Sequence, residues 1–337
     1  MKYNKAEYIS KQETQVLKGV SILLMLFLHL FNQMKNVDLC NNFIFIGDQP
    51  FVHILTRACN PVSFFLILGG YGMYIVSQKR DTHRVTRIIK LLIHFWIITL
   101  IFISIGHLLF PNRYPQSFIT ALQNFTGFKT TYNAELWFLL PYILLSLTSG
   151  WLFLFAERFK TRYVLTFLFI LHLFTSFLIS RYGEKYLYNN YWIYNPILIL
   201  HLMFSFFMGA MAAKHNVFSL FSNYDWHLFA WPSLIILIAI RCLFNTSIIH
   251  NFYAFAFFFL FLKAGRFRCI DKVLGFLGKH SMNMWMIHSW FCYYLFHDFI
   301  YGFRYPIIIF VVLVIISVTC SMIVNVICEP IKKMCKV

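Results

Sequence analysis

Charged residues are scarce in this chain. They occupy only 12% of the 337 positions, and Asp and Glu together number 12. Soluble domains carry about 25% charged residues, so this composition excludes an ordinary water-soluble protein. Hydrophobic residues make up 60% of the sequence. They gather in runs of about 18 to 22 residues, the length that crosses a bilayer as a helix. The composition therefore predicts an all-α, polytopic integral membrane protein.

Cysteine patterns, repeats and linkers are also missing. The eight cysteines form no CxxC pair and no Cys/His ligand spacing, so we predict no bound metal and no disulfide framework. Only Cys40 and Cys59 are expected on the oxidising side of the membrane, and we do not expect a bridge between them. No segment is long enough for a soluble domain, which predicts one membrane domain over residues 1–337.

Basic residues give a formal net charge of +17, which by itself would suggest a nucleic-acid partner. Lys and Arg lie almost entirely between the apolar stretches rather than along basic amphipathic helices, so we expect no nucleic-acid binding. Their distribution instead follows the positive-inside rule and predicts that both termini are cytoplasmic.

Hydropathy windows predict ten membrane-spanning helices around a central polar cavity. The predicted spans are residues 16–33, 54–76, 88–109, 136–156, 163–180, 194–212, 227–245, 248–263, 281–299 and 305–328.

The first span is apolar but carries Lys18 at its start and His29 well inside. On a helix these two residues are about 20° out of alignment and about 16 Å apart along the axis. Ser21 and Asn32 fall within about 60° of the same line, so one face of this span is polar. An ionisable group at this depth favours a functional cavity. The alternative is a neutral histidine that only joins helices.

The segment after the second span is the most basic. Arg84 and Arg87 are three residues apart and share a helix face, and Lys90 extends the row. Guanidinium groups bind phosphates bidentately, so this face is a candidate site for a phosphorylated cofactor. Topology and anionic lipid explain the same charges equally well. Within the second span, Gly69-Gly70-Tyr71-Gly72 permits close approach of a neighbouring helix.

Two later segments supply further candidates for cavity lining. Glu135 and Trp137 begin the fourth span, where a tryptophan is an ordinary interfacial anchor and a solvated glutamate is expected. Ser281 is predicted to cap the ninth span, which places His288 about two turns inside that helix, facing the same cavity.

These motifs, in this order, resemble those of the family-3 membrane acyltransferases, which modify bacterial surface polysaccharides, often by O-acetylation. The resemblance covers roughly residues 14–328. It rests on Lys18-Gly19-Val20-Ser21-Ile22 leading to His29, Phe64-Phe65 with Gly69-Gly70-Tyr71, Arg84-x-x-Arg87, Leu136-Trp137-Phe138-Leu139, and Gly278-Lys279-His280-Ser281 leading to Ile287-His288. Many members carry arginine where this chain has Lys18. The Leu-Trp-Phe-Leu segment is similar to the branch that acts on capsule and exopolysaccharide sugars.

The resemblance implies a ten-helix enzyme of the bacterial inner membrane. It implies acetyl-CoA as donor and a polysaccharide or lipid-linked sugar as acceptor at the outer side. His29 is then the general base, about 20 Å from the inner end of the predicted helix. Arg84, Arg87, Lys18 and Lys90 are then the donor-binding residues.

Other functions remain open at this stage. A transporter or flippase for lipid-linked sugars would use a similar polar cavity without chemistry, although no inverted repeat is evident. A polyprenyl-linked glycosyltransferase would need clustered acidic residues in the first outer loop, where Asp38 and Asp48 are ten apart. Succinyl-CoA or another short acyl donor would fit the same fold. The acceptor sugar and the oligomeric state are not predicted.

Overall fold

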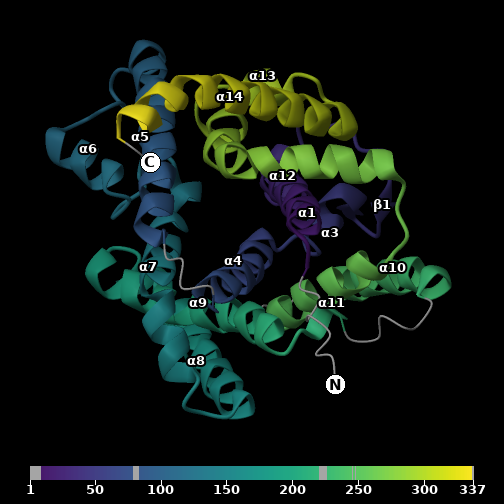
Figure 1. Ribbon diagram of the computed structural model, residues 1–337. Helices are drawn as coiled ribbons and strands as arrows, with labels where there is room; N and C mark the ends of the chain where they lie inside the picture. Colours follow the sequence, from purple (N-terminus) through teal and green to yellow (C-terminus); the bar gives the residue numbers. More distant parts are fainter. Residues whose placement is uncertain (1–8, 79–82, 220–225, 245, 247, 336–337) are drawn as a thin grey trace.

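The computed structural model describes residues 9–78, 83–219, 226–244, 246 and 248–335. Within these residues the chain is nearly all helical (Figure 1). The strands described are those of one short hairpin, in which Phe45–Ile46 (β1) pairs antiparallel with Gln49–Pro50 (β2).

The helices follow one another with short connections. They are α1 (Lys11–Phe31), α2 (Met34–Val37), α3 (Phe51–Thr56), α4 (Pro61–Gln78), α5 (Arg84–Leu109), α6 (Phe118–Phe125), α7 (Leu139–Ala156), α8 (Thr161–Tyr182), α9 (Tyr191–Lys214), α10 (His227–Leu243), α11 (His250–Lys263), α12 (Arg268–Ser289), α13 (His297–Tyr301) and α14 (Pro306–Met334). Short 3-10 turns are η1 (Ala134–Leu136) and η3 (Val217–Ser219), and π-helical turns are η2 (Gly183–Leu187) and η4 (Trp290–Tyr294).

Seven segments of the described chain are long and apolar enough to cross a membrane. They are α1, the α3–α4 pair, α5, η1 with α7, α8 with η2, α9 and α14. The three other predicted spans correspond to α10, α11 and α12, of which α10 and α11 have only 17 and 14 residues. The first half of α12 carries charged residues. The protein is therefore a multi-pass membrane protein, and the number of ten membrane-spanning helices stays a prediction.

Two helix starts differ from the predicted ones. α1 begins at Lys11, where Ser10 caps it and exchanges hydrogen bonds with Glu13 in a capping box. α12 begins at Arg268, well before residue 281, where the ninth span was predicted to begin. Ser281 is not an N-cap, because it lies inside α12 and donates to the carbonyl of Gly278 at 2.8 Å. Both helices begin before their apolar windows, because their first turns are amphipathic and contain polar residues that hydropathy does not count toward a span.

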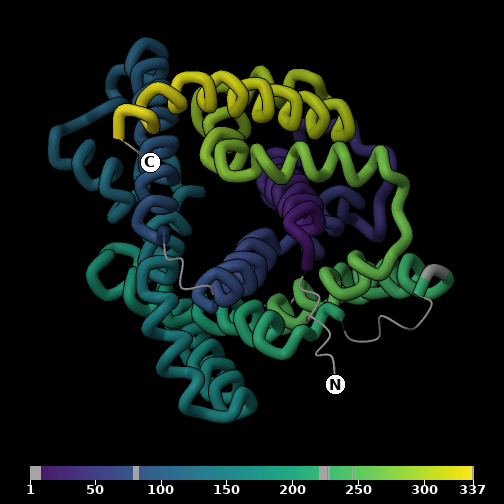
Figure 2. The backbone as a smooth tube through the Cα atoms, viewed as in Figure 1, coloured from purple at the N-terminus to yellow at the C-terminus, as the bar shows by residue number. Residues whose placement is uncertain are grey.

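The helices form two groups joined by α5 and α7 (Figure 1). α1, α12 and α14 form one group, and α4, α8, α9, α10 and α11 form the other. The tube in Figure 2 shows α1, in purple at the N-terminal end, lying beside the green α12. α1 also contacts α4, which packs mainly on α9. The face of α1 between α4, α5 and α12 is where the candidate site lies.

Two glycines set the distance between α1 and α12. A Cβ atom on Gly278 would lie 1.9 Å from the backbone oxygen of Gln15, and one on Gly19 would lie 2.0 Å from that of Leu274. Each helix therefore packs directly against the backbone of the other. Close approach through glycine was predicted for the second span and is found there too, since a Cβ on Gly70 would lie 1.8 Å from the oxygen of Phe206 on α9.

Replacing Gly278 with alanine is expected to lower the free energy of unfolding by roughly 1 to 3 kcal/mol, because a helix backbone cannot rotate away as a side chain can. Thermal unfolding of the detergent-solubilised protein measures this. Gly275→Ala is the matched control, because it lies one turn away on α12 and its Cβ meets no atom within 4 Å. Equal melting temperatures for the two variants would contradict the packing described.

Candidate functional site

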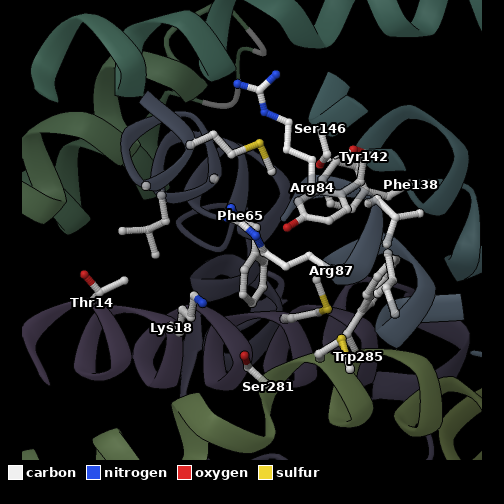
Figure 3. Close-up of a pocket in the computed structure, with 18 residues that line it drawn as sticks. Thr14, Lys18, Phe65, Arg84, Arg87, Phe138, Tyr142, Ser146, Ser281 and Trp285 are labelled. Carbon is white, nitrogen blue, oxygen red and sulfur yellow. Dashed lines mark hydrogen bonds between the residues drawn. The ribbon is translucent and has the colours of Figure 1, made fainter. Parts of the chain in front are cut away.

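A cavity of about 370 Å³ lies between α1, α4, α5, α7 and α12 (Figure 3). Most of its wall is apolar, with polar and charged groups gathered toward one end. Its lining residues are Thr14, Lys18, Met25, Phe65, Leu68, Gly69, Gly72, Met73, Arg84, Arg87, Ile88, Leu91, Phe138, Tyr142, Ser146, Ser281, Met282 and Trp285. The cavity thus brings the predicted residues Lys18, Arg84, Arg87 and Ser281 together from three helices.

Three basic residues line this cavity. In Figure 3 the side chain of Arg87 reaches into its centre from α5, and Lys18 approaches from α1. Among the described residues, no carboxylate lies within ion-pair distance of Lys18, Arg84 or Arg87. Like charges that converge without a counter-ion repel one another, so an anionic ligand would stabilise this arrangement.

Arg84 is held against α7. A Cβ atom on Gly150 would lie 2.0 Å from Arg84 Nη1, so the guanidinium occupies the space that any larger residue at position 150 would fill. This contact fixes Arg84 at the wall of the cavity, while Arg87 extends into it. The two arginines therefore line the cavity from one face of α5, but their guanidinium groups point in different directions (Figure 3).

Lys90 does not line the cavity, although the sequence placed it in the same row. Lys90 follows Arg84 by six residues, so its side chain is rotated by about 120° from that of Arg84 around the helix axis. The side chain of Lys90 is exposed. Lys90 therefore points away from Arg84, because spacings of three drift around a helix of 3.6 residues per turn, and its predicted contact with the donor stays a prediction.

His29 also lies outside the lining of the cavity. The cavity ends at Met25, one turn before it on α1, and at Trp285 on α12. His29 is half-buried in the last turn of α1, about 27 Å from Lys11 by the helical rise rather than the predicted 20 Å. Lys18 therefore lines the cavity, whereas His29 lies on the same helix one turn beyond Met25, where the cavity ends.

A second imidazole faces His29. The rings of His29 and His288 have centroids 5.0 Å apart. Like His29, His288 does not line the cavity, so its predicted place in the cavity wall stays a prediction. His288 is fully buried, and its Nδ1 donates to the backbone oxygens of Trp285 and Met284 at 2.8 and 3.2 Å. Its Nε2 has no hydrogen-bond partner among the described residues.

A hydroxyl and an amide complete this group. Tyr293 lies on the π-helical turn η4, and its hydroxyl is 3.0 Å from Asn32 Oδ1 and 3.4 Å from His29 Nδ1. Asn32 is the C-cap residue of α1 and is half-buried, as are His29 and Tyr293. Half-burial of all three side chains leaves the histidine accessible from one side.

The remaining predicted residues have other surroundings. Ser21 is fully buried and donates to the Leu17 carbonyl at 2.8 Å, so its hydroxyl has a hydrogen-bond partner within α1. Glu135 is half-buried rather than solvated, and Oε2 accepts from the Tyr294 hydroxyl at 2.7 Å. Trp137 packs edge-on against Phe138, with centroids 5.9 Å apart. None of these three residues lines the cavity.

Cys40 and Cys59 are both free thiols. Cys40 lies in the connection after α2, outside the spans, and burial raises the pKa of its thiol to about 11. It therefore stays protonated at neutral pH and is a poor partner for disulfide exchange.

Sequence reasoning missed several residues of the site. Tyr293 was not singled out, because a π-helical turn changes the direction of side chains in a way that no sequence period reveals. Tyr142 and Ser146 also line the cavity from α7, one helical turn apart. Their spacing of four residues was the available signal, but it does not differ from ordinary helix packing.

The fold and site define a multi-pass membrane protein with a mostly apolar cavity, a cationic end and a nearby pair of histidines. The family model described as an acyltransferase domain, of acyltransferase family 3, matches residues 13–326. The chain belongs to this family and is an acyltransferase. Neither the comparison with curated proteins nor that with solved structures returned a match.

Proposed function

We propose that this protein transfers an acetyl group from acetyl-CoA to a hydroxyl of a cell-surface polysaccharide or of its lipid-linked precursor. The observation that carries the proposal is the cavity lined by Lys18, Arg84 and Arg87, which have no carboxylate partner among the described residues. Lys18 lies on α1, the helix that also carries His29. Family membership supports acyl transfer, and the cations favour a phosphorylated acyl donor.

The donor enters at the end that carries Lys18 and the two arginines. Its phosphates bind the guanidinium groups and the ammonium, while the apolar wall packs on the pantetheine arm. The positive-inside rule places this end in the cytoplasm, together with Lys332 and Lys333 at the end of α14. Both termini are then cytoplasmic, in a bacterial inner membrane, and the acceptor approaches His29 from the outer side.

The acyl end of the donor has to pass the end of the cavity to reach His29. Met25 and Trp285 lie there, one helical turn from His29 and three residues from His288. Methionine has an unbranched, flexible side chain that repacks at low cost. Movement of the Met25 side chain then opens the cavity to His29. Lys18 and His29 are about 16 Å apart along the helix axis, and the donor has to span this distance.

His29 acts as the general base. Its imidazole takes the proton of the acceptor hydroxyl as that oxygen attacks the thioester carbonyl carbon. The C–O bond forms, the C–S bond breaks, and the CoA thiolate leaves with the proton returned by the imidazolium. A two-step route, with the acetyl group passing through the His29 ring, uses the same residue and gives the same products.

Glycines at the cavity wall offer a test of where the donor binds. Gly72 lines the cavity, and its added Cβ meets no atom within 4 Å. Gly72→Leu is therefore expected to fold but to fill part of the cavity, and to raise the Kd for acetyl-CoA about tenfold or more. Gly275→Leu, equally uncrowded but outside the cavity, is the control, and equal Kd values for the two variants would contradict this binding site.

The proposed function is tested in membrane vesicles from cells that produce the protein, supplied with acetyl-CoA labelled in its acetyl group. We expect label to appear in the glycan or lipid-linked sugar fraction, matched by release of the CoA thiol. Movement of lipid-linked sugar that does not depend on acetyl-CoA, without transfer of label, would instead establish a transporter. Transfer from succinyl-CoA in preference to acetyl-CoA would correct the donor.

A further inference from the structure

The side chains of His29, Tyr293 and Asn32 form one hydrogen-bonded group. We propose that Tyr293 and Asn32 are positioning residues that hold His29 in the tautomer with Nδ1 protonated and Nε2 free to act as base. The proposal rests on the proposed function of His29 and adds two residues that act through it.

The Tyr293 hydroxyl has one hydrogen and two possible acceptors. The Tyr293 hydroxyl contacts two groups, Asn32 Oδ1 at 3.0 Å and His29 Nδ1 at 3.4 Å, and has a single hydrogen to donate. The amide oxygen of Asn32 can only accept, so it takes that hydrogen. The tyrosine oxygen is then an acceptor toward His29, and Nδ1 has to donate to it. A neutral imidazole protonated at Nδ1 has its lone pair on Nε2.

His288 leaves that lone pair available. Because its Nδ1 donates to the carbonyl oxygens of Met284 and Trp285, its own Nε2 is unprotonated when the ring is neutral. His288 therefore has no N–H to donate to His29, although the two rings are 5.0 Å apart between centroids. The lone pair of His29 Nε2 stays free for the acceptor hydroxyl.

Position along the chain supports the same role. Tyr293 lies on the π-helical turn Trp290–Tyr294, and its ring is edge-on to His29, with centroids 5.8 Å apart. Asn32 follows directly after α1, and its side chain is not used to cap the helix, since the cap is a backbone bond from Asn32 N to Leu28 O. Both side chains are thus free to orient the histidine.

Removing the amide has a different consequence from removing the hydroxyl. In Asn32→Ala the tyrosine hydrogen is released and can turn to His29 Nδ1, which then becomes the acceptor and moves the proton to Nε2. That tautomer cannot accept a proton from substrate at Nε2. Asn32→Asp keeps an acceptor oxygen for Tyr293 and preserves the native arrangement. Tyr293→Phe removes the tether but keeps the ring.

The experiment measures CoA thiol release from acetyl-CoA in membrane vesicles, normalised to the amount of protein. We expect kcat to fall about 10- to 100-fold in Tyr293→Phe and at least as far in Asn32→Ala. The KM for acetyl-CoA should stay within about twofold, since both residues lie outside the donor cavity. Asn32→Asp should restore most of kcat. Tyr305→Phe, an exposed tyrosine that stacks on Phe43, is the matched control.

The outcomes separate this proposal from the proposed function. Unchanged kcat in Tyr293→Phe, or equal losses in Asn32→Asp and Asn32→Ala, would overturn the role of the two residues while the wild type still transfers acetyl groups. A wild-type protein that releases no CoA thiol would overturn the proposed function itself.

Discussion

Replacing His29 with alanine is expected to lower acetyl transfer by about 10²- to 10⁴-fold, the contribution typical of a positioned general base. The loss should appear in kcat, because the ring does not line the cavity in which we propose that the donor binds. The amount of protein inserted in the membrane should not change, since among the described residues the side chain has a single, long hydrogen bond, to Tyr293 at 3.4 Å. CoA thiol release and an immunoblot of the membrane fraction measure the two quantities.

His215→Ala is the matched control for this variant. His215 is exposed at the end of α9, where it contacts the Thr161 hydroxyl, and it lies outside the cavity. It should transfer acetyl groups at the wild-type rate. Normal acetylation by His29→Ala would remove the general-base mechanism, whatever the behaviour of the control.

Replacing Arg87 with alanine is expected to weaken acetyl-CoA binding by about 10- to 100-fold, the range expected when one charge-assisted hydrogen bond to a phosphate is lost. Arg84→Ala should behave similarly, through loss of the guanidinium that packs over Gly150. Both variants should affect the Kd for acetyl-CoA more than kcat, since the arginines line the cavity and His29 lies outside it. Equilibrium binding to the solubilised protein measures the Kd.

Lys90→Ala is the control that distinguishes a role of the arginines in donor binding from a role in membrane topology. Lys90 belongs to the same basic segment and contributes the same charge to the positive-inside balance, but it lies outside the cavity. We expect its Kd for acetyl-CoA to equal that of the wild type. Normal affinity in Arg84→Ala and Arg87→Ala, together with reduced membrane insertion, would assign the arginines to topology alone.

The sequence predicted the parts of the site that one helix determines. Lys18 and His29 share the polar face of α1, and Arg84 and Arg87 both reach the cavity from the start of α5. Only the family resemblance grouped Lys18 with these arginines, because their meeting at one cavity depends on how α1 packs against α5 and α12. Backbone contacts at Gly19 and Gly278 fix that packing, and a hydropathy profile contains no information on such contacts.

The errors have related causes. Ser281 was read as a helix cap because the apolar window of the ninth span begins there, whereas Arg268 is the first residue of α12. The polar residues of its first half extend the helix but lower its hydropathy. Tyr293 was missed because the π-helical turn breaks the regular period. Helix existence followed from composition, whereas helix ends and side-chain direction depended on tertiary contacts.

The most direct measurement is mass spectrometry of surface glycans and their lipid-linked precursors from cells without the protein, with the wild type, and with His29→Ala. The account predicts sugar units heavier by the replacement of one hydrogen with an acetyl group in the wild type only. Acetylated sugar in the cells that carry His29→Ala, at the wild-type level, would contradict it.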